Sequence, residues 1–511
     1  MRAVQTRLWS VVALLVTLMT ANAFAQDLAS FEKRTSTRKL ANGLTVIITE
    51  RHDAPVFSYA TVVNAGSAQE VPGITGLAHM FEHMAFKGSD RVGTKDWAAE
   101  QKALQKVEEA YAAYTRAAHV ETGGDEAKTK ELEKAWRDAI AEADKFVVDN
   151  EFSTIVDRSG GVGMNAFTAS DITAYFFSLP SNRFELWAFL ESERFRNPVF
   201  RQFYKERDVV FEERRMRIES SPFGRLFEQF LATAFIAHPY GFSGVGWPSD
   251  LHSFSATDAA NFAKKYYVPS NMVVAIVGDV NANEAWPIME KYFGQIPSRP
   301  QPESLRTVEP PQTAERVVIL RETAQPIYLE GYHRPAVTHP DNATYDVISM
   351  LLSTGRTSRL YKALVRDKKI AAQAAGFNGL PGEKYPHLFA FLGVTTPGHT
   401  NDEIAAAIGE EVEKLKKDDI PADELASVKT RVKAGLVRQL DSNSGLALQL
   451  ASYQTTYGDW RELFREVERI DKVSAADVKR VANETFVPSH RTVGKIESNK
   501  STPAAPKGGT Q

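Results

Sequence analysis

A pattern of two strands followed by a helix occurs twice in the chain, and this duplication constrains its fold more than any other feature. The strand segments are rich in β-forming residues, and the helical segments have helical apolar spacing. Between the copies, residues 297–314 hold five prolines and predict a semi-rigid linker. The copies are residues 38–50, 56–67 and 76–86, and residues 315–323, 326–337 and 342–352.

We therefore expect two similar domains, residues 26–296 and 315–497, followed by a disordered tail, residues 498–511. The length of 511 residues is sufficient for two or three domains, and 43% of the residues are hydrophobic. The net charge of -3 and the lack of a Lys/Arg block argue against nucleic-acid binding. The absence of cysteine rules out disulfides and cysteine catalysis.

The N-terminus has the features of a secretory signal peptide. Arg2 and Arg7 precede an apolar segment, residues 8–19, and Ala23 and Ala25 form an A-x-A cleavage pattern. We expect cleavage after Ala25 and a periplasmic or secreted protein with no membrane span. The alternative is an uncleaved membrane anchor.

Residues 95–150 interrupt the symmetry between the halves. They are rich in Ala, Glu and Lys, and they contain two apolar stripes separated by a Gly-Gly turn. We expect a helical hairpin inserted into the first domain, with stripes that pack on each other; a partner-docking arm is the alternative. The stripes are Leu104, Val107, Tyr111, Tyr114 and Ala118, and Leu132, Trp136, Ile140, Ala143 and Val147.

The helical segment 76–86 contains the pattern H-x-x-E-H. His79 and His83 are four residues apart, so on a helix both imidazoles can face one metal ion. Glu82 lies beside His83 and can reach a water at that ion. This is the order of the inverted zinc-protease motif, and zinc needs a third protein ligand and an open position.

A second helical segment, residues 203–217, offers the third ligand. Glu206 and Glu213 are seven residues apart, which is two helical turns, so they share a face. Glu212 is a competing ligand, although it points about 100° away from Glu213. The corresponding segments of the second half, residues 348–361 and 422–436, lack this set of ligands.

Several motifs together make the chain resemble the pitrilysin family, the M16 zinc metallopeptidases, and in particular its short bacterial branch. The resemblance covers nearly the whole chain after the signal peptide. The motifs are HMFEHMAFKGS (residues 79–89), MNAFTASDITAYF (164–176), LESERFRNP (190–198), ERDVVFEE (206–213), HPYG (238–241) and SRLYKALVRDK (358–368).

The resemblance implies a zinc metalloendopeptidase with one Zn²⁺ per chain, held by His79, His83 and Glu213. It makes Glu82 the general base and Glu206 an acid beside the site. It also implies an α+β fold: two homologous domains, each a mixed β-sheet with helices packed on one face, arranged as half of a clam-shell. The second domain would be inactive, and the chain would act on peptides or unfolded segments as a homodimer or heterodimer with a homologous subunit.

Substrate contacts are implied less directly. Asn165 and Ala166 resemble the edge strand that pairs with an extended substrate, although Asn165 is equally well explained as a turn or capping residue. Arg366 matches an arginine that grips substrate, whereas Gln373, expected on the same helix, replaces the usual tyrosine. The alternative function is a non-catalytic scaffold or peptide-binding subunit.

Overall fold

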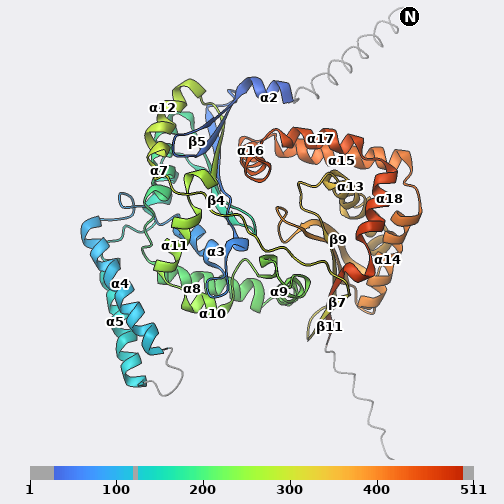
Figure 1. The fold of residues 1–511 in the computed structure, drawn as a ribbon, viewed down its shortest axis with the longest axis horizontal. Helices are drawn as coiled ribbons and strands as arrows, with labels where there is room; N and C mark the ends of the chain where they lie inside the picture. The colour runs from blue at the N-terminus through green and yellow to red at the C-terminus, as the bar shows by residue number, and fades with distance from the viewer. Residues whose placement is uncertain (1–27, 119–124, 499–511) are drawn as a thin grey trace, which may run out of the picture.

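The computed structural model describes residues 28–118 and 125–498, which form two β-sheets flanked by helices (Figure 1). Each sheet contains one parallel strand pair among antiparallel pairs, so the expected α+β class with mixed sheets is confirmed. The predicted signal peptide and most of the predicted tail lie outside the described residues. Within the described ranges, no helix has the length and apolar character needed to cross a membrane.

The first sheet has six strands in the order β1-β2-β6-β3-β5-β4. Its strand β6 pairs parallel with β2 and antiparallel with β3, and every residue of β6 is buried, as expected for a central apolar strand. Strand β4 is an edge strand. The strands are β1 Thr35–Lys39, β2 Thr45–Glu50, β3 Val56–Val63, β4 Val162–Thr168, β5 Thr173–Pro180 and β6 Met272–Gly278.

The second sheet has five strands in the order β7-β11-β8-β10-β9. The prediction that one helix carries both Arg366 and Gln373 is wrong. A π-helical segment, Tyr361–Asp367, ends before edge strand β9 begins. Gln373 lies in β9 and pairs with Val394. The strands are β7 Arg316–Glu322, β8 Ile327–Arg334, β9 Ala371–Leu380, β10 His387–Thr395 and β11 Arg491–Ser498.

Each half contributes a helix that covers one face of the other half's sheet. Helix α16 packs on β3 and β6 of the first sheet, and helix α9 packs on β7 and β11 of the second (Figure 1). The opposite faces carry the helices of their own half. Because each half covers a sheet of the other, the two halves form one packed body.

The helices of the first half are α2 Leu28–Arg34, α3 Leu77–Met84, α4 Trp97–Ala118, α5 Glu126–Asp144, α6 Glu151–Arg158, α7 Phe184–Arg196, α8 Phe203–Arg214, α9 Pro222–Ala234, α10 Pro248–Ser253, α11 Ala256–Tyr266 and α12 Ala282–Tyr292. Those of the second half are α13 Asn342–Ser353, α14 Asn401–Lys417, α15 Ala422–Gln439, α16 Asn443–Tyr457, α17 Glu462–Lys472 and α18 Ala475–Thr485.

Helices α4 and α5 form an antiparallel pair that projects from the first half (Figure 1). The sequence predicts that their apolar stripes pack on each other. In the structure, the stripes also pack on α8. The Tyr204 ring contacts both Tyr111 and Trp136, whose ring centroids are 4.5 and 5.0 Å away. Glu108 accepts a hydrogen bond from the Tyr204 hydroxyl at 2.6 Å. The base of the pair is therefore part of the first core.

Residues 297–314 form neither helix nor strand, but they are attached to the first half. The Glu309 carboxylate accepts hydrogen bonds from the backbone N–H groups of Ile236, Ala237 and His238 at 2.9–3.0 Å. These charge-assisted bonds fix the path of the chain between the sheets.

His387 is a buried histidine at the start of β10 in the second sheet. Burial, followed by the charge of Arg334, lowers the pKa of His387 from 6.5 to about 3. In the unfolded chain the imidazole binds a proton below about pH 6.5, whereas in the folded chain it stays neutral. Stability from this residue is therefore present above about pH 6.5 and is lost as the pH falls towards 3.

We predict that His387→Gln weakens this acid sensitivity. Between about pH 6.5 and 4.5, the free energy of unfolding of the wild type should fall by about 1.4 kcal/mol per pH unit more than that of the variant. Urea denaturation at a series of pH values measures this difference in the free energy of unfolding. His339→Gln is the control, because the His339 side chain is 44% exposed. Parallel pH curves for wild type and His387→Gln would contradict the assignment.

Candidate metal centre

Two buried carboxylates fix the start of α3, the helix that carries the H-x-x-E-H motif. Glu70 accepts hydrogen bonds at 2.7 Å from the backbone N–H groups of Gly76 and Ala78. Asp250 accepts from the Thr75 backbone at 3.1 Å and from its hydroxyl at 2.6 Å. Gly76 has φ +91°, and a Cβ there would lie 2.7 Å from the Val245 carbonyl oxygen. These contacts satisfy the exposed N–H groups at the helix start and set its direction.

Helix α3 buries its apolar side and turns the motif residues towards α8. Leu77, Met80, Phe81 and Met84 are in the first core, and the Phe81 and Tyr267 ring centroids are 4.1 Å apart. The remaining face presents the two histidines and Glu82, as expected from a spacing of three and four residues.

The structure brings His79, His83 and Glu213 together. Glu213 Oε2 lies 3.5 Å from His79 Nε2 and 3.6 Å from His83 Nε2, and the candidate ligand atoms of the three residues are within 4.8 Å of one another. Two ligand atoms of a tetrahedral zinc site are separated by about 3.3 Å, given the usual zinc–ligand bond lengths. The donor set and its spacing therefore fit zinc.

Glu206 orients the second histidine. Its Oε2 atom lies 3.4 Å from His83 Nδ1, and its other oxygen is paired with Lys87. An imidazole that donates from Nδ1 keeps Nε2 free as a lone-pair donor, which is the common arrangement behind metal-bound histidines. Burial raises the pKa of Glu206, but hydrogen bonds from His83 and Lys87, together with the charges of these residues, outweigh it and lower the pKa to about 2. Glu206 is therefore ionised at neutral pH.

The two histidines have different electrostatic surroundings. Burial, together with the charges of His83 and Arg217, lowers the pKa of His79 to about 3, so its ring is neutral at pH 7. Burial also lowers the pKa of His83, but the surrounding carboxylates of Glu206, Glu82 and Glu213 hold it above its ordinary value. A metal ion must compete with a proton at the second histidine.

Glu82 lies beside this group and does not belong to the three candidate ligands. Its Oε2 atom accepts a hydrogen bond of 2.7 Å from the Thr168 hydroxyl at the end of β4. Burial raises the pKa of Glu82, and the hydrogen bond from Thr168 and the charge of His83 oppose that shift. A carboxylate with a pKa moved towards neutrality is suited to general-base work.

Edge strand β4 runs beside α3. Asn165 and Ala166 pair with Phe176 and Tyr175 of β5 on one side, and the other side of β4 has no strand partner among the described residues. The Asn165 side chain is exposed, and its amide oxygen accepts from the Ala166 backbone at 2.9 Å. The free edge can accept an extended peptide as an added strand.

Arg366 is not part of the metal group. Its side chain is paired with Asp367 at 2.6 and 2.9 Å, and it lines a hollow of about 560 Å³ on the second half together with Arg359, Lys362 and Glu410. None of the metal-centre residues lines that hollow. Substrate contact by Arg366 stays a prediction.

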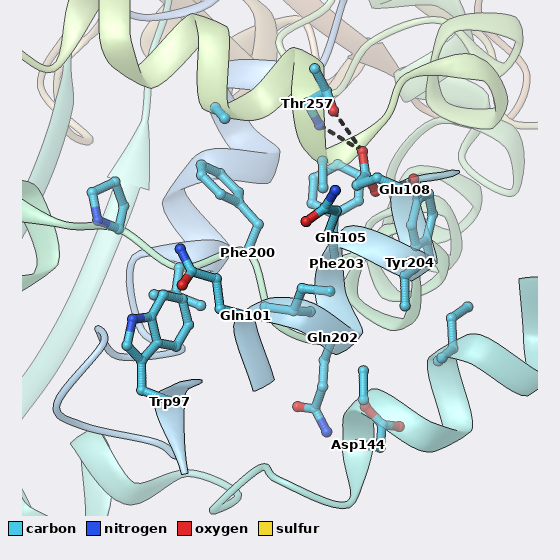
Figure 2. Close-up of a pocket in the computed structure, with 18 residues that line it drawn as sticks. Trp97, Gln101, Gln105, Glu108, Asp144, Phe200, Gln202, Phe203, Tyr204 and Thr257 are labelled. Carbon is cyan, nitrogen blue, oxygen red and sulfur yellow. Dashed lines mark hydrogen bonds between the residues drawn. The ribbon is translucent and has the colours of Figure 1, made fainter. Parts of the chain in front are cut away.

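A separate apolar cavity of about 260 Å³ lies where the α4–α5 pair meets α8 (Figure 2). Trp97, Phe200 and Phe203 form apolar walls of the cavity (Figure 2). At its rim, the Glu108 carboxylate accepts hydrogen bonds from the backbone N–H and the hydroxyl of Thr257. No residue predicted to act in catalysis or metal binding lines this cavity.

The second half has no comparable group in the part of the chain that the structure describes. In place of a metal set, Glu424 of α15 forms an ion pair with Arg359 at 2.7 Å, and Arg431 donates to Thr357. The candidate metal centre is confined to the first half.

His79, His83 and Glu213 could hold a metal ion, and comparisons with known sequences show to which family the chain belongs. Residues 45–120 match the family model described as insulinase (peptidase family M16), and residues 253–432 match the model described as peptidase M16 inactive domain. The chain belongs to the M16 family of peptidases.

Relatives cover almost the whole chain. The zinc protease PqqE of Helicobacter pylori is 29% identical over 497 residues, which cover 95% of this chain and 97% of that protein. YmxG of Bacillus subtilis, described as an uncharacterized zinc protease, is 21% identical, and the match covers 87% of this chain and 94% of YmxG. The crystal structure of a protease from Helicobacter pylori has a TM-score of 0.75 at 27% identity, covering 91% and 99% of the two chains.

The periplasmic protease PqqL of Escherichia coli shares the fold, with a TM-score of 0.66 at 17% identity. The match covers 93% of this chain but only 49% of that protein.

Three residues around the site were not identified from the sequence. Lys87 is four residues after His83, and Arg217 is four residues after Glu213, so helical spacing could have suggested both. Arg217 forms an ion pair with Glu213 Oε1 at 2.5 Å. Thr168 is 86 residues from Glu82, and no local pattern links the two.

We predict that Glu213→Gln lowers zinc affinity far more than Glu212→Gln. Glu213 faces both histidines, whereas Glu212 is 61% exposed and paired with Arg215. Glu206→Gln should fall between them, with a loss of about 10–100-fold, because it acts through His83. Chelator competition measures the affinities, and equal zinc retention in Glu213→Gln and Glu212→Gln would contradict the assignment.

Proposed function

We propose that this chain is a zinc-dependent endopeptidase that hydrolyses peptides or unfolded segments. The observation that carries the proposal is the convergence of His79, His83 and Glu213 with Glu82 beside them. Three protein ligands leave a fourth position of a tetrahedral zinc open, which distinguishes catalytic from structural zinc sites.

Bound zinc would supply an activated water nucleophile and polarise the carbonyl of the bond to be cleaved. Glu82 would take the proton from that water and return it to the leaving amine. Thr168 holds the Glu82 carboxylate in place through its 2.7 Å hydrogen bond. Glu206, itself paired with Lys87, would keep the His83 ring oriented as a ligand.

The free edge of β4 would position the substrate. Main-chain pairing along Asn165 and Ala166 tolerates many side chains, so it suits a peptidase of broad specificity. Because β4 lies beside α3, a peptide paired with β4 would pass next to Glu82.

The relatives support a peptidase, since PqqE and YmxG are named zinc proteases. The alternative is a non-catalytic M16 scaffold or peptide-binding subunit, a role that the match to the inactive-domain model leaves possible for the second half. The complete set of candidate ligands in the first half favours the enzyme.

Export and assembly are further parts of the proposal. The predicted signal peptide would direct the chain to the periplasm or the exterior. A second M16 chain, identical or related, would be the partner, and a related chain could supply the tyrosine that Gln373 replaces.

We predict that Glu82→Gln keeps zinc and loses peptide hydrolysis. The amide preserves size but cannot accept the proton, and Glu82 does not contribute to the ligand set. Metal analysis combined with cleavage of a quenched peptide measures both properties, with Glu212→Gln as the control that should keep both. Substantial turnover by zinc-loaded Glu82→Gln would refute the role of general base.

A further inference from the structure

Arg217 is an exposed cation at the edge of the metal centre. It lies in the π-helical turn Arg215–Glu219, which continues α8 directly. Its Nη2 atom is 2.5 Å from Glu213 Oε1, while the other Glu213 oxygen faces the two histidines. The Arg217 side chain is 62% exposed, so its remaining N–H groups face solvent beside the candidate ligands.

Neighbouring basic residues are engaged elsewhere. Arg214 is buried, forms an ion pair with Glu228 at 2.9 Å and donates to the Gly246 carbonyl. Arg215 is exposed but is paired with Glu212, which is not a member of the metal group. Lys87 is largely buried against Glu206. Arg217 therefore combines exposure with contact to a candidate metal ligand.

The charge of Arg217 reaches the metal group directly, because its guanidinium pairs with the candidate ligand Glu213. A divalent ion bound by Glu213 would share that carboxylate and weaken its hold on Arg217. The guanidinium would then be a partly released cation beside the candidate ligands.

We infer that Arg217 binds a carboxylate of the peptide substrate close to the cleaved bond. A guanidinium presents a planar fork of donors that matches a carboxylate, and exposure leaves one side of this fork free. The inference rests on the proposed peptidase function and adds a preference for acidic substrates. The carboxylate is that of an acidic side chain or of the peptide C-terminus.

The first test compares twin peptides on the zinc-loaded full-length protein. Quenched peptides carry one Glu at successive positions around the cleaved bond, and each has a twin with Gln at that position. A second pair compares a free C-terminus with an amidated one, which distinguishes the two sources of the carboxylate. We expect one acidic peptide to be preferred by about three- to tenfold in kcat/KM, since half-exposed ion pairs are modest.

Arg217→Met should reduce the ratio within that twin pair to about one, and Arg217→Glu should invert it. A ratio within each variant is unaffected by a uniform change in rate or in metal loading. Arg215→Met is the matched control, because Arg215 has nearly the same exposure and also pairs with a glutamate of α8. This control should keep the wild-type ratio.

A binding measurement separates this inference from the proposed function. Zinc-loaded Glu82→Gln should bind the preferred acidic peptide more tightly than its Gln twin by fluorescence anisotropy, and adding Arg217→Met should remove the difference. If the wild type cleaves no peptide, the proposed function is wrong, and the anisotropy result still decides the role of Arg217. Equal ratios in wild type and Arg217→Met, in cleavage and in binding, would overturn the inference.

Discussion

The metal centre depends on one buried side chain, Arg201, which joins the loop after α3 to the start of α8. Its guanidinium donates to the carbonyl oxygens of Lys87, Ser89 and Val92 at 2.6–2.8 Å and forms an ion pair with Glu100 at 2.8 Å. A buried charge with this many partners is costly to disturb, because losing one partner leaves the guanidinium with an unsatisfied donor or an unpaired charge. Arg201 therefore fixes the distance between the two histidines and the helix that carries Glu213.

The projecting helix pair contributes to the same arrangement, since Glu100 belongs to α4 and Tyr204 of α8 packs against both helices. At its other end, α8 continues through the π-helical turn into α9, which covers the second sheet. Helix α8, which carries Glu206 and Glu213, is thus held at both ends. The α4–α5 pair holds its start, and α9, which packs on the second sheet, holds its end. This rigidity suits a site whose three ligand atoms must stay within a few ångströms.

The sequence was informative where the site depends on helical spacing. The grouping of His79, Glu82 and His83, and of Glu206 with Glu213, follows from which residues share a helix face. The choice of Glu213 as the ligand over Glu212 came from the resemblance to M16 peptidases. Contacts between distant segments, such as Thr168 with Glu82, leave no local pattern. Gln373 was expected on a helix because residues 360–376 were matched to a helix of the family, but pairing with β10 places Gln373 in a strand. The apolar stripes of residues 95–150 predict helices, whereas their packing on α8 depends on tertiary structure.

The proposed function requires that α3 and α8 together create one zinc site. X-ray diffraction on either side of the zinc absorption edge, recorded from crystals of the zinc-loaded protein, locates the ion directly. We expect one strong anomalous peak in contact with His79 Nε2, His83 Nε2 and Glu213 Oε2. A loaded protein whose zinc peak lies elsewhere, or whose Glu213 does not contact the ion, would contradict it.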